Sequence, residues 1–179
     1  MNKPFVVLSL IAALSVGGCG YTTRSVLSPE YKSIEVENVK NSISVTAEQD
    51  NLRMYRGYRP GMEVELTKAI IDAYLFDGNL KVSQEGNADL ILVSELVDFK
   101  REPLRYDAND NIEEYRIKLY VNMELQDANS GATLWKERGF SGEATYSTSG
   151  TYAKPESAAV TDAIKDLARR IVERTIEAW

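Results

Sequence analysis

The reactive side chains in this sequence of 179 residues restrict the chemistry open to it. Histidine is absent, which removes the commonest general base and the commonest metal ligand. A single cysteine, Cys19, excludes an internal disulfide and a cysteine-based zinc site. Serine–histidine and cysteine–histidine catalysis are therefore excluded. Two pairs of carboxylates, Glu35 with Glu37 and Glu113 with Glu114, are better explained as exposed strand positions than as a general acid and base. We predict a protein that is not an enzyme and holds no metal.

The position of Cys19 indicates another use for its thiol. A short cationic start precedes the run Pro4–Val16, which is apolar and shorter than the ~20 residues that a membrane-spanning helix needs. Two small residues, Gly17-Gly18, then lead directly into the cysteine. This arrangement resembles a bacterial lipobox, in which the cysteine receives a diacylglycerol and the signal is removed. The alternative is an ordinary secretory signal with a stray cysteine.

The lipobox reading divides the chain into three parts. Residues 1–18 are the predicted lipoprotein signal peptide, 19–30 the lipidated tether, and 31–179 a single α+β domain. Acyl chains on Cys19 would hold the protein in a lipid bilayer, at about 0.8 kcal/mol per buried CH₂. By resemblance to lipoprotein sorting, Gly20 in place of Asp favours the outer membrane.

Five basic residues lie across one predicted hairpin of this acidic chain. They are Lys100, Arg101, Arg105, Arg116 and Lys118. Arg and Lys bind phosphate groups through charge-assisted hydrogen bonds, so this cluster is a candidate anion site. The alternative is an ordinary solvated strand face. A net charge of −6 argues against nucleic acid as a partner.

Alternating side chains predict the strands that carry these residues. From Tyr115 to Leu125 every second residue is apolar, which is typical of a half-buried antiparallel strand. Ala88–Arg101 is predicted as the preceding strand and Pro103 as its end. Ala132–Tyr146 completes the antiparallel set, with Trp135 on the face opposite to that of Leu134 and Phe140 and with Gly139 and Gly142 as candidate bulges.

Two segments have the periodicity of helices. The first runs from Pro60-Gly61 to Asp77-Gly78, and we expect Val64, Ile71, Leu75 and Phe76 to widen its apolar stripe. The second runs from Pro155 to Trp179. A short strand at Ile34–Val36 precedes them, and Leu80–Ser83 is a candidate edge strand. The predicted fold is α+β, order β-α-β-β-β-α, with a mainly antiparallel or mixed sheet of four to five strands and two helices packed on one face.

Several segments in this order resemble the lipopolysaccharide-assembly lipoprotein family LptE. They are Cys19-Gly20-Tyr21, Gly61–Leu80, Ala88-Asp89, the run from Lys100 to Leu104, Glu114-Tyr115-Arg116, and Gly131–Trp135. The resemblance covers about residues 19–178. The segment from Asn41 to Arg59 departs from it, because that loop is longer than the family pattern.

The resemblance implies an outer-membrane, lipid-anchored protein that faces the periplasm and has no cofactor. It implies that the protein plugs and helps to assemble a large LptD-type β-barrel and binds lipopolysaccharide during its transport to the cell surface. The five basic residues are then candidate lipopolysaccharide contacts. The alternative is an outer-membrane lipoprotein that activates a periplasmic cell-wall synthase or pilots a secretin.

Overall fold

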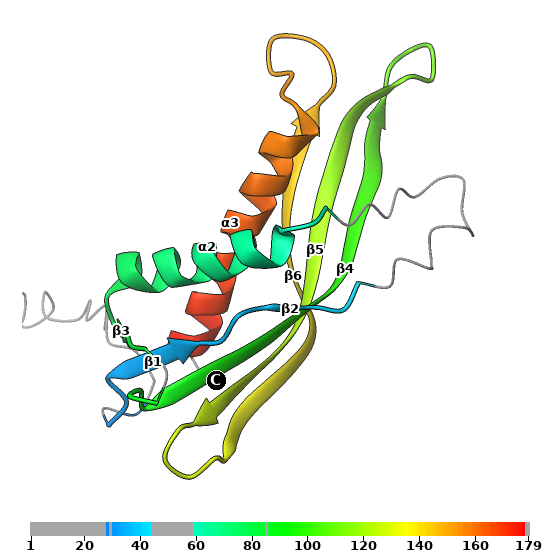
Figure 1. The fold of residues 1–179 in the computed structure, drawn as a ribbon. Coiled ribbons are helices and arrows are strands. Elements are labelled where there is room, and N and C mark those ends of the chain that lie inside the picture. Colours follow the sequence, from blue (N-terminus) through cyan, green and yellow to red (C-terminus); the bar gives the residue numbers. More distant parts are fainter. Residues whose placement is uncertain (1–27, 29, 44–58, 85, 178–179) are drawn as a thin grey trace, which may run out of the picture.

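The computed structural model describes residues 28, 30–43, 59–84 and 86–177, which form six strands and two helices (Figure 1). In chain order these are β1 (Ser33–Val36), β2 (Lys40–Asn41), α2 (Met62–Asp77), β3 (Lys81–Val82), β4 (Leu90–Tyr106), β5 (Ile112–Asp127), β6 (Thr133–Ser147) and α3 (Glu156–Ile176). The predicted order is confirmed. The candidate edge strand at Leu80–Ser83 is confirmed as β3, and the two-residue strand β2 is added. Cys19 and the predicted signal peptide lie outside the described residues.

The sheet is mixed and has the strand order β3-β1-β4-β5-β6, with β2 beside β4. The strands β4, β5 and β6 form an antiparallel meander, whereas β1 runs parallel to β3 and β4. The predicted alternation sets the register of β5. Tyr115 is half-buried, and the five apolar residues that alternate after it are buried: Ile117, Leu119, Val121, Met123 and Leu125. These residues define the inner face of the sheet.

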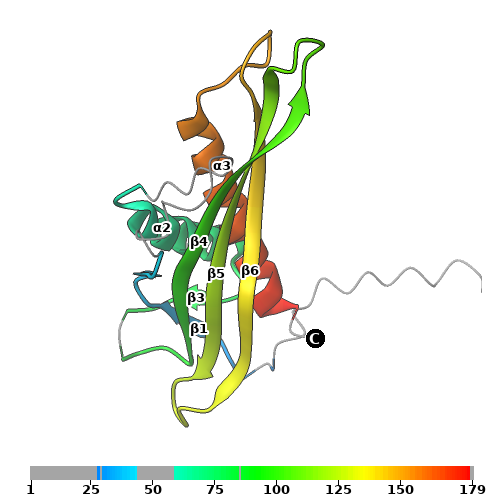
Figure 2. The same cartoon turned by 90° about the vertical axis from the view of Figure 1, so that its right-hand side faces the viewer.

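Both helices lie against this inner face, and no described element covers the opposite, outer face (Figure 2). The helix α3 packs on β5 and β6, and α2 packs on α3. The predicted core positions of α3 are buried: Val160, Ala163, Ile164, Leu167, Ala168 and Ile171. Each fully buried large side chain contributes about 1.5–3 kcal/mol to folding. The hydroxyl of Tyr74 in α2 donates a hydrogen bond of 2.7 Å to Thr175 in α3 and joins the helices inside this core.

The predicted end of β4 at Pro103 is wrong, since the strand continues to Tyr106. Its parallel partners end earlier, with β1 paired up to Leu92 and β2 up to Leu96. Beyond Leu96, β4 is therefore an edge strand of the described sheet. Proline is tolerated there because a missing N–H on the free side breaks no ladder hydrogen bond.

The predicted apolar stripe of α2 is also partly wrong. Its buried side is narrower and is formed by Met62, Leu66, Thr67, Ile70 and Tyr74. The side chains of Val64, Leu75 and Phe76 point to solvent instead, and Phe76 is 95% exposed. The reason is that the inner face of the sheet is shared with α3, so α2 contacts its neighbours along one side only.

Gly139 and Gly142 of β6 were both candidate bulges, and only Gly139 forms one. Gly139 has a φ of 64° and lies at a register shift between β5 and β6, as expected of a bulge. The bulge reverses the alternation, so Trp135 and Phe140 lie on the same inner face, opposite Leu125 and Val121. The prediction of opposite faces was therefore wrong.

Gly142 allows close packing rather than a bulge. A Cβ atom built on it would lie 2.5 Å from the Cα atom of Leu167 in α3. The helix can therefore approach β6 this closely only because residue 142 has no side chain.

Candidate functional site

The sheet places the five predicted basic residues in three different environments. On the outer face, Lys100 of β4 lies opposite Lys118 of β5, and the neighbouring pair is Glu102 with Arg116. Arg105 lies near the end of the hairpin, with 59% of its side chain exposed. Arg101 lies opposite Ile117, whose side chain is buried on the inner face. The structure thus brings Lys100, Arg116 and Lys118 together and directs Arg101 away from them.

Acidic neighbours balance the charge of the outer face. Lys100 lies 3.5 Å from Asp98, and Lys118 lies 3.8 Å from both Glu102 and Glu143. Arg116 approaches Glu143 at 3.8 Å. Three cations therefore meet three carboxylates. Partly exposed ion pairs of this length are worth about 0–1 kcal/mol each, so an incoming anion could replace them at little cost.

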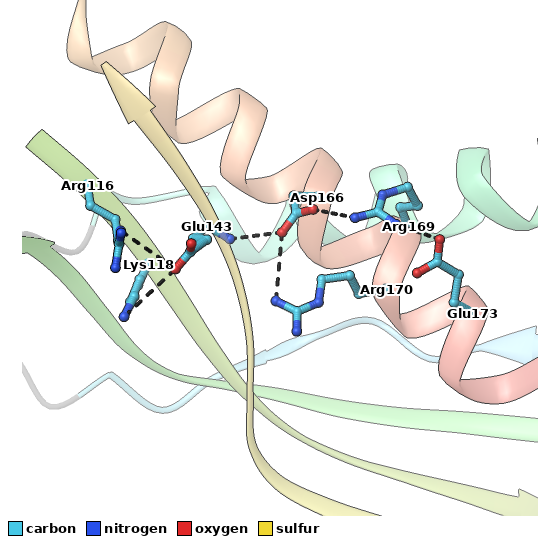
Figure 3. A network of polar contacts seen from close by, with 7 residues as sticks. All are labelled: Arg116, Lys118, Glu143, Asp166, Arg169, Arg170 and Glu173. Carbon is cyan, nitrogen blue, oxygen red and sulfur yellow. Dashed lines mark hydrogen bonds and ion pairs between the residues drawn. The ribbon is translucent and has the colours of Figure 1, made fainter. Parts of the chain in front are cut away.

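A polar network continues from the outer face around the edge of β6 to α3 (Figure 3). The backbone N–H of Glu143 donates a hydrogen bond of 3.0 Å to Asp166 of α3. Asp166 also accepts a hydrogen bond of 2.7 Å from Arg169 and lies 3.9 Å from Arg170. Because an unpaired edge N–H invites pairing with another strand, Asp166 protects β6 from such contacts at this position.

The sequence did not reveal a second polar cluster, which is centred on Glu156 at the start of α3. Its carboxylate accepts hydrogen bonds from Arg101 at 2.7 Å, Arg59 at 3.0 Å and the Tyr146 hydroxyl at 3.2 Å. The Arg101 guanidinium also lies 4.7 Å from the ring centre of Tyr115, which stacks on Tyr146. This Glu156 cluster joins β4, β6, α3 and the approach to α2.

Electrostatics in the Glu156 cluster favour the ion pair. Desolvation lowers the pKa of Arg101, but the hydrogen bond and charge of Glu156 outweigh it and leave that pKa raised. Burial, together with the charge of Glu156, raises the pKa of the Tyr146 hydroxyl. Arg101 therefore stays charged and Tyr146 stays protonated at neutral pH. Both groups join α3 to the sheet.

Two aspartates, Asp89 and Asp127, bind the first residues of the domain at the end of the sheet that lies away from the Glu156 cluster. Asp127 accepts a hydrogen bond of 2.9 Å from the Tyr31 hydroxyl and others from Ser130 in the β5–β6 turn. Asp89 accepts hydrogen bonds from the backbone of Lys32 and from Ser33. Hydrogen bonds to these carboxylates, first from the Ser130 and Lys32 backbones, lower the pKa of both aspartates. The first residues of the predicted domain, Tyr31 to Ser33, are thus attached to the ends of β4 and β5.

The exposed side of α2 lies between two grooves. A groove of about 760 Å³ separates α2 from α3, and Ala69, Ala73 and Phe76 contribute its α2 wall. A smaller groove of about 450 Å³ lies on the other side of the helix and is lined by Val64 and Ile71 among others. Both grooves are lined by apolar and charged side chains together.

Other kinds of site were sought in the described part of the chain. Over the ranges given above, no group of three or more Cys, Asp or Glu side chains is placed to hold a metal ion. Among the same residues, neither helix has the length and hydropathy needed to cross a bilayer. The candidate functional features are therefore surfaces: the outer face of the sheet and the grooved side of α2.

Comparison with known proteins gives one family and several similar structures. The model of the lipopolysaccharide-assembly family LptE matches residues 31–175. None of the curated proteins matches the sequence. A hypothetical protein from Chlamydia trachomatis is 13% identical, with a TM-score of 0.52, over 81% of this chain and 95% of its own. A protein from Xanthomonas campestris is 14% identical, with a TM-score of 0.50, over 83% and 88%. These two likenesses concern the fold alone.

Proposed function

Since the chain belongs to the lipopolysaccharide-assembly family LptE, we propose that it is an outer-membrane lipoprotein that plugs and helps to assemble a large LptD-type β-barrel. In this proposal it also binds lipopolysaccharide during transport to the cell surface. The family match over residues 31–175 is the observation that carries the proposal, because it spans the whole described domain. Membership implies a role in lipopolysaccharide assembly, and the family is not enzymatic.

The outer face of the sheet supports the plug role. Barrel lumens are polar, so a plug needs a polar surface with few unpaired charges. Along β5 the residues that alternate with the core are Arg116, Lys118, Tyr120, Asn122 and Glu124. The ion pairs described above balance the charges of Arg116 and Lys118, and Lys136 of β6, at 2.6 Å, balances that of Glu124. A face of this kind can lie against a polar wall without burying an isolated charge.

The lipid anchor of this proposal is Cys19. Eleven residues lie between it and Tyr31, whose hydroxyl donates a hydrogen bond to Asp127. A fully extended chain of this length spans at most about 40 Å, so acylation would keep the domain close to the periplasmic surface of the outer membrane. Mass spectrometry of the mature chain tests this step: the expected N-terminal residue is an acylated Cys19, and any other N-terminus contradicts it.

The proposed lipopolysaccharide contacts are the outer-face residues Lys100, Arg116 and Lys118. Their long ion pairs can be exchanged for phosphate oxygens, whereas Arg101 is held by Glu156. We expect the double variant Lys100→Glu with Lys118→Glu to retain less lipopolysaccharide in a pull-down. The matched control is Lys81→Glu with Arg138→Glu, which changes the same charge at exposed positions away from the hairpin. Equal retention by both double variants would exclude the outer face as the binding site.

Identification of the proteins that co-purify with the chain tests the proposal as a whole. The tagged full-length chain is purified from detergent-solubilised outer membranes, and the proteins that come with it are identified by mass spectrometry. A large outer-membrane β-barrel is the expected partner. Recovery of a cell-wall synthase or a secretin without a barrel would favour the alternative lipoprotein roles and refute the plug.

A further inference from the structure

An aromatic side chain, Tyr120 of β5, lies among the charged residues of the outer face. Its neighbours across the sheet are Asp98 of β4 and Ser141 of β6. Lys100 reaches over the Tyr120 ring, with its Nζ atom 4.9 Å from the ring centre. Tyr120 is partly exposed, and its hydroxyl forms no hydrogen bond within the described part of the chain. An aromatic ring with a free polar tip on an uncovered face is typical of binding surfaces.

The cations beside Tyr120 are arranged in a way that a bound anion would stabilise. Lys100 and Lys118 occupy directly opposite positions on β4 and β5, and like charges in such positions destabilise a sheet. The Nε atom of Arg116, two residues before Lys118, is buried without a hydrogen-bond acceptor among the described residues. An anion between these three side chains would offset the repulsion of the lysines and supply the missing acceptor.

The carboxylates already present hold these cations loosely. Glu143 of β6 is shared by Arg116 and Lys118 and lies 3.8 Å from each, which is too long for hydrogen bonds (Figure 3). Asp98 and Glu102 approach the two lysines at 3.5 and 3.8 Å, and all three carboxylates are partly exposed. They can therefore turn to solvent when a stronger anion enters. A phosphate monoester is such an anion, because it carries nearly two negative charges and three acceptor oxygens.

The polar groups around the Tyr120 ring suit a sugar. Asp98 offers carboxylate oxygens, Ser141 a hydroxyl, and Asn122, the next outward residue of β5, an amide. Sugar rings present C–H groups on their faces and hydroxyl groups at their edges, so an aromatic ring surrounded by short polar side chains complements both. Tyr120 lies two residues from Lys118, about 7 Å along the strand, which is a suitable separation for a phosphate and the sugar that bears it.

We propose that this part of the outer face binds a phosphorylated sugar, with the phosphate held by Lys100, Arg116 and Lys118 and the sugar ring placed on Tyr120. Lys100 then exchanges an exposed cation–π contact, which is weak, for a charge-assisted hydrogen bond. The inference rests on the proposed function and deepens it. It names the phosphorylated sugar head as the part of lipopolysaccharide that is recognised, and Tyr120 as the residue that distinguishes it from other phosphates.

The test measures dissociation constants by ligand-observed NMR with the full-length, acylated chain in a detergent that has no sugar or phosphate groups. The probes are the anomeric phosphate of N-acetylglucosamine, inorganic phosphate, N-acetylglucosamine, and glycerol phosphate as the head group of a phospholipid. We expect the sugar phosphate to bind more tightly than inorganic phosphate and glycerol phosphate, and the uncharged sugar to bind more weakly than all three.

Three variants separate the sugar contact from the phosphate contact. Tyr120→Leu should weaken binding of the sugar phosphate by roughly fivefold and leave binding of inorganic phosphate unchanged. Lys118→Gln should weaken binding of both probes. The control Tyr152→Leu removes a ring that is 86% exposed in the loop after β6 and should match the wild type. Thermal unfolding of the same samples shows whether the fold is kept, and Tyr120→Phe, which retains the ring, should bind the sugar phosphate within about twofold of the wild type.

The outcomes separate this inference from the proposed function. If the sugar phosphate binds no more tightly than glycerol phosphate, or if folded Tyr120→Leu binds it as tightly as the wild type, the sugar site is wrong. The proposed function still stands in that case if the wild-type chain retains lipopolysaccharide and recovers the barrel in pull-downs. If the wild type recovers neither but shows sugar-phosphate binding that depends on Tyr120, the proposed function fails and the site is supported.

Discussion

Replacing Glu156 tests whether Arg101 acts in folding or in ligand binding. The Glu156 carboxylate lies 2.7 Å from Arg101, with exposed side-chain fractions of 19% and 27%. Removing one partner of a fully buried pair costs about 3–5 kcal/mol, whereas exposed pairs contribute about 0–1 kcal/mol. For this intermediate burial, with further hydrogen bonds from Arg59 and Tyr146, we expect Glu156→Gln to lower the free energy of unfolding by about 2 kcal/mol.

The assay is denaturant and thermal unfolding of the full-length chain in detergent. A loss of about 2 kcal/mol corresponds to a fall of about 4–8 °C in melting temperature for a protein of this size. The double-mutant cycle of Glu156→Gln with Arg101→Gln should give a coupling energy above about 1 kcal/mol, because the two residues share one contact. The control Arg105→Gln breaks a more exposed pair with Glu113 and should change stability by less than about 0.5 kcal/mol.

The reasoning is refuted if the coupling energy is near zero. It is also refuted if Arg101→Gln abolishes lipopolysaccharide retention while the melting temperature stays unchanged. In that case Arg101 is a ligand contact, as the sequence alone suggested, and its pairing with Glu156 is incidental.

Three further predictions concern stability. Gly142→Ala should lower the free energy of unfolding by about 2 kcal/mol or more in denaturant titrations, since its Cβ would collide with the backbone of Leu167; an unchanged midpoint would contradict the close packing. Hydrogen bonds from Lys136, Thr133 and Gln126 lower the pKa of Glu124 from 4.5 to about 2. The stability that the ionised Glu124 carboxylate contributes is therefore complete above about pH 5 and is lost as the pH falls towards 2. The Glu124→Gln variant should lack this part of the pH dependence of unfolding. If the variant and the wild type lose stability in the same way as the pH is lowered, the assignment to Glu124 is wrong. Ser94 is buried, and its hydroxyl has no hydrogen-bond partner among the described residues. Ser94→Ala should therefore leave the free energy of unfolding unchanged or raise it by up to about 1 kcal/mol in denaturant titrations. A fall of more than about 1 kcal/mol would show that the hydroxyl does make a stabilising hydrogen bond.

The parts of the fold that depend on local periodicity could be predicted from the sequence. The alternation in β5 and the apolar stripe of α3 are set by residues close together in the chain, and the structure confirms both. The continuation of β4 beyond Pro103 could not be predicted, because it depends on where the parallel partners of this strand end. That information is not contained in the segment itself.

The face of the sheet on which each basic residue lies could not be predicted from the sequence either. A register shift between Leu96 and Asp98 changes which residues of β4 face inward, so Lys100 and Arg101 cannot be assigned to a face by counting from Leu90. The partner of Arg101 is 55 residues away in the sequence, and no pattern around Glu156 marks it. The exposed apolar side of α2 resembled core in the sequence, because periodicity alone does not show whether a face is covered.

The family resemblance came from the order of several weak segments rather than from one motif, and the family match over residues 31–175 confirms it. The acylation of Cys19 stays a prediction, since that residue lies outside the described part of the chain. The binding of lipopolysaccharide and of the barrel likewise stay proposals with the tests given above.

The central claim is that the chain assembles and plugs a barrel in the outer membrane. It is tested most directly by depleting the chain from cells and measuring how much of the barrel protein stays in the folded, heat-modifiable form. The account predicts that the folded fraction falls as the chain is lost and returns when the full-length chain is restored. A folded fraction that stays constant through complete depletion would contradict it.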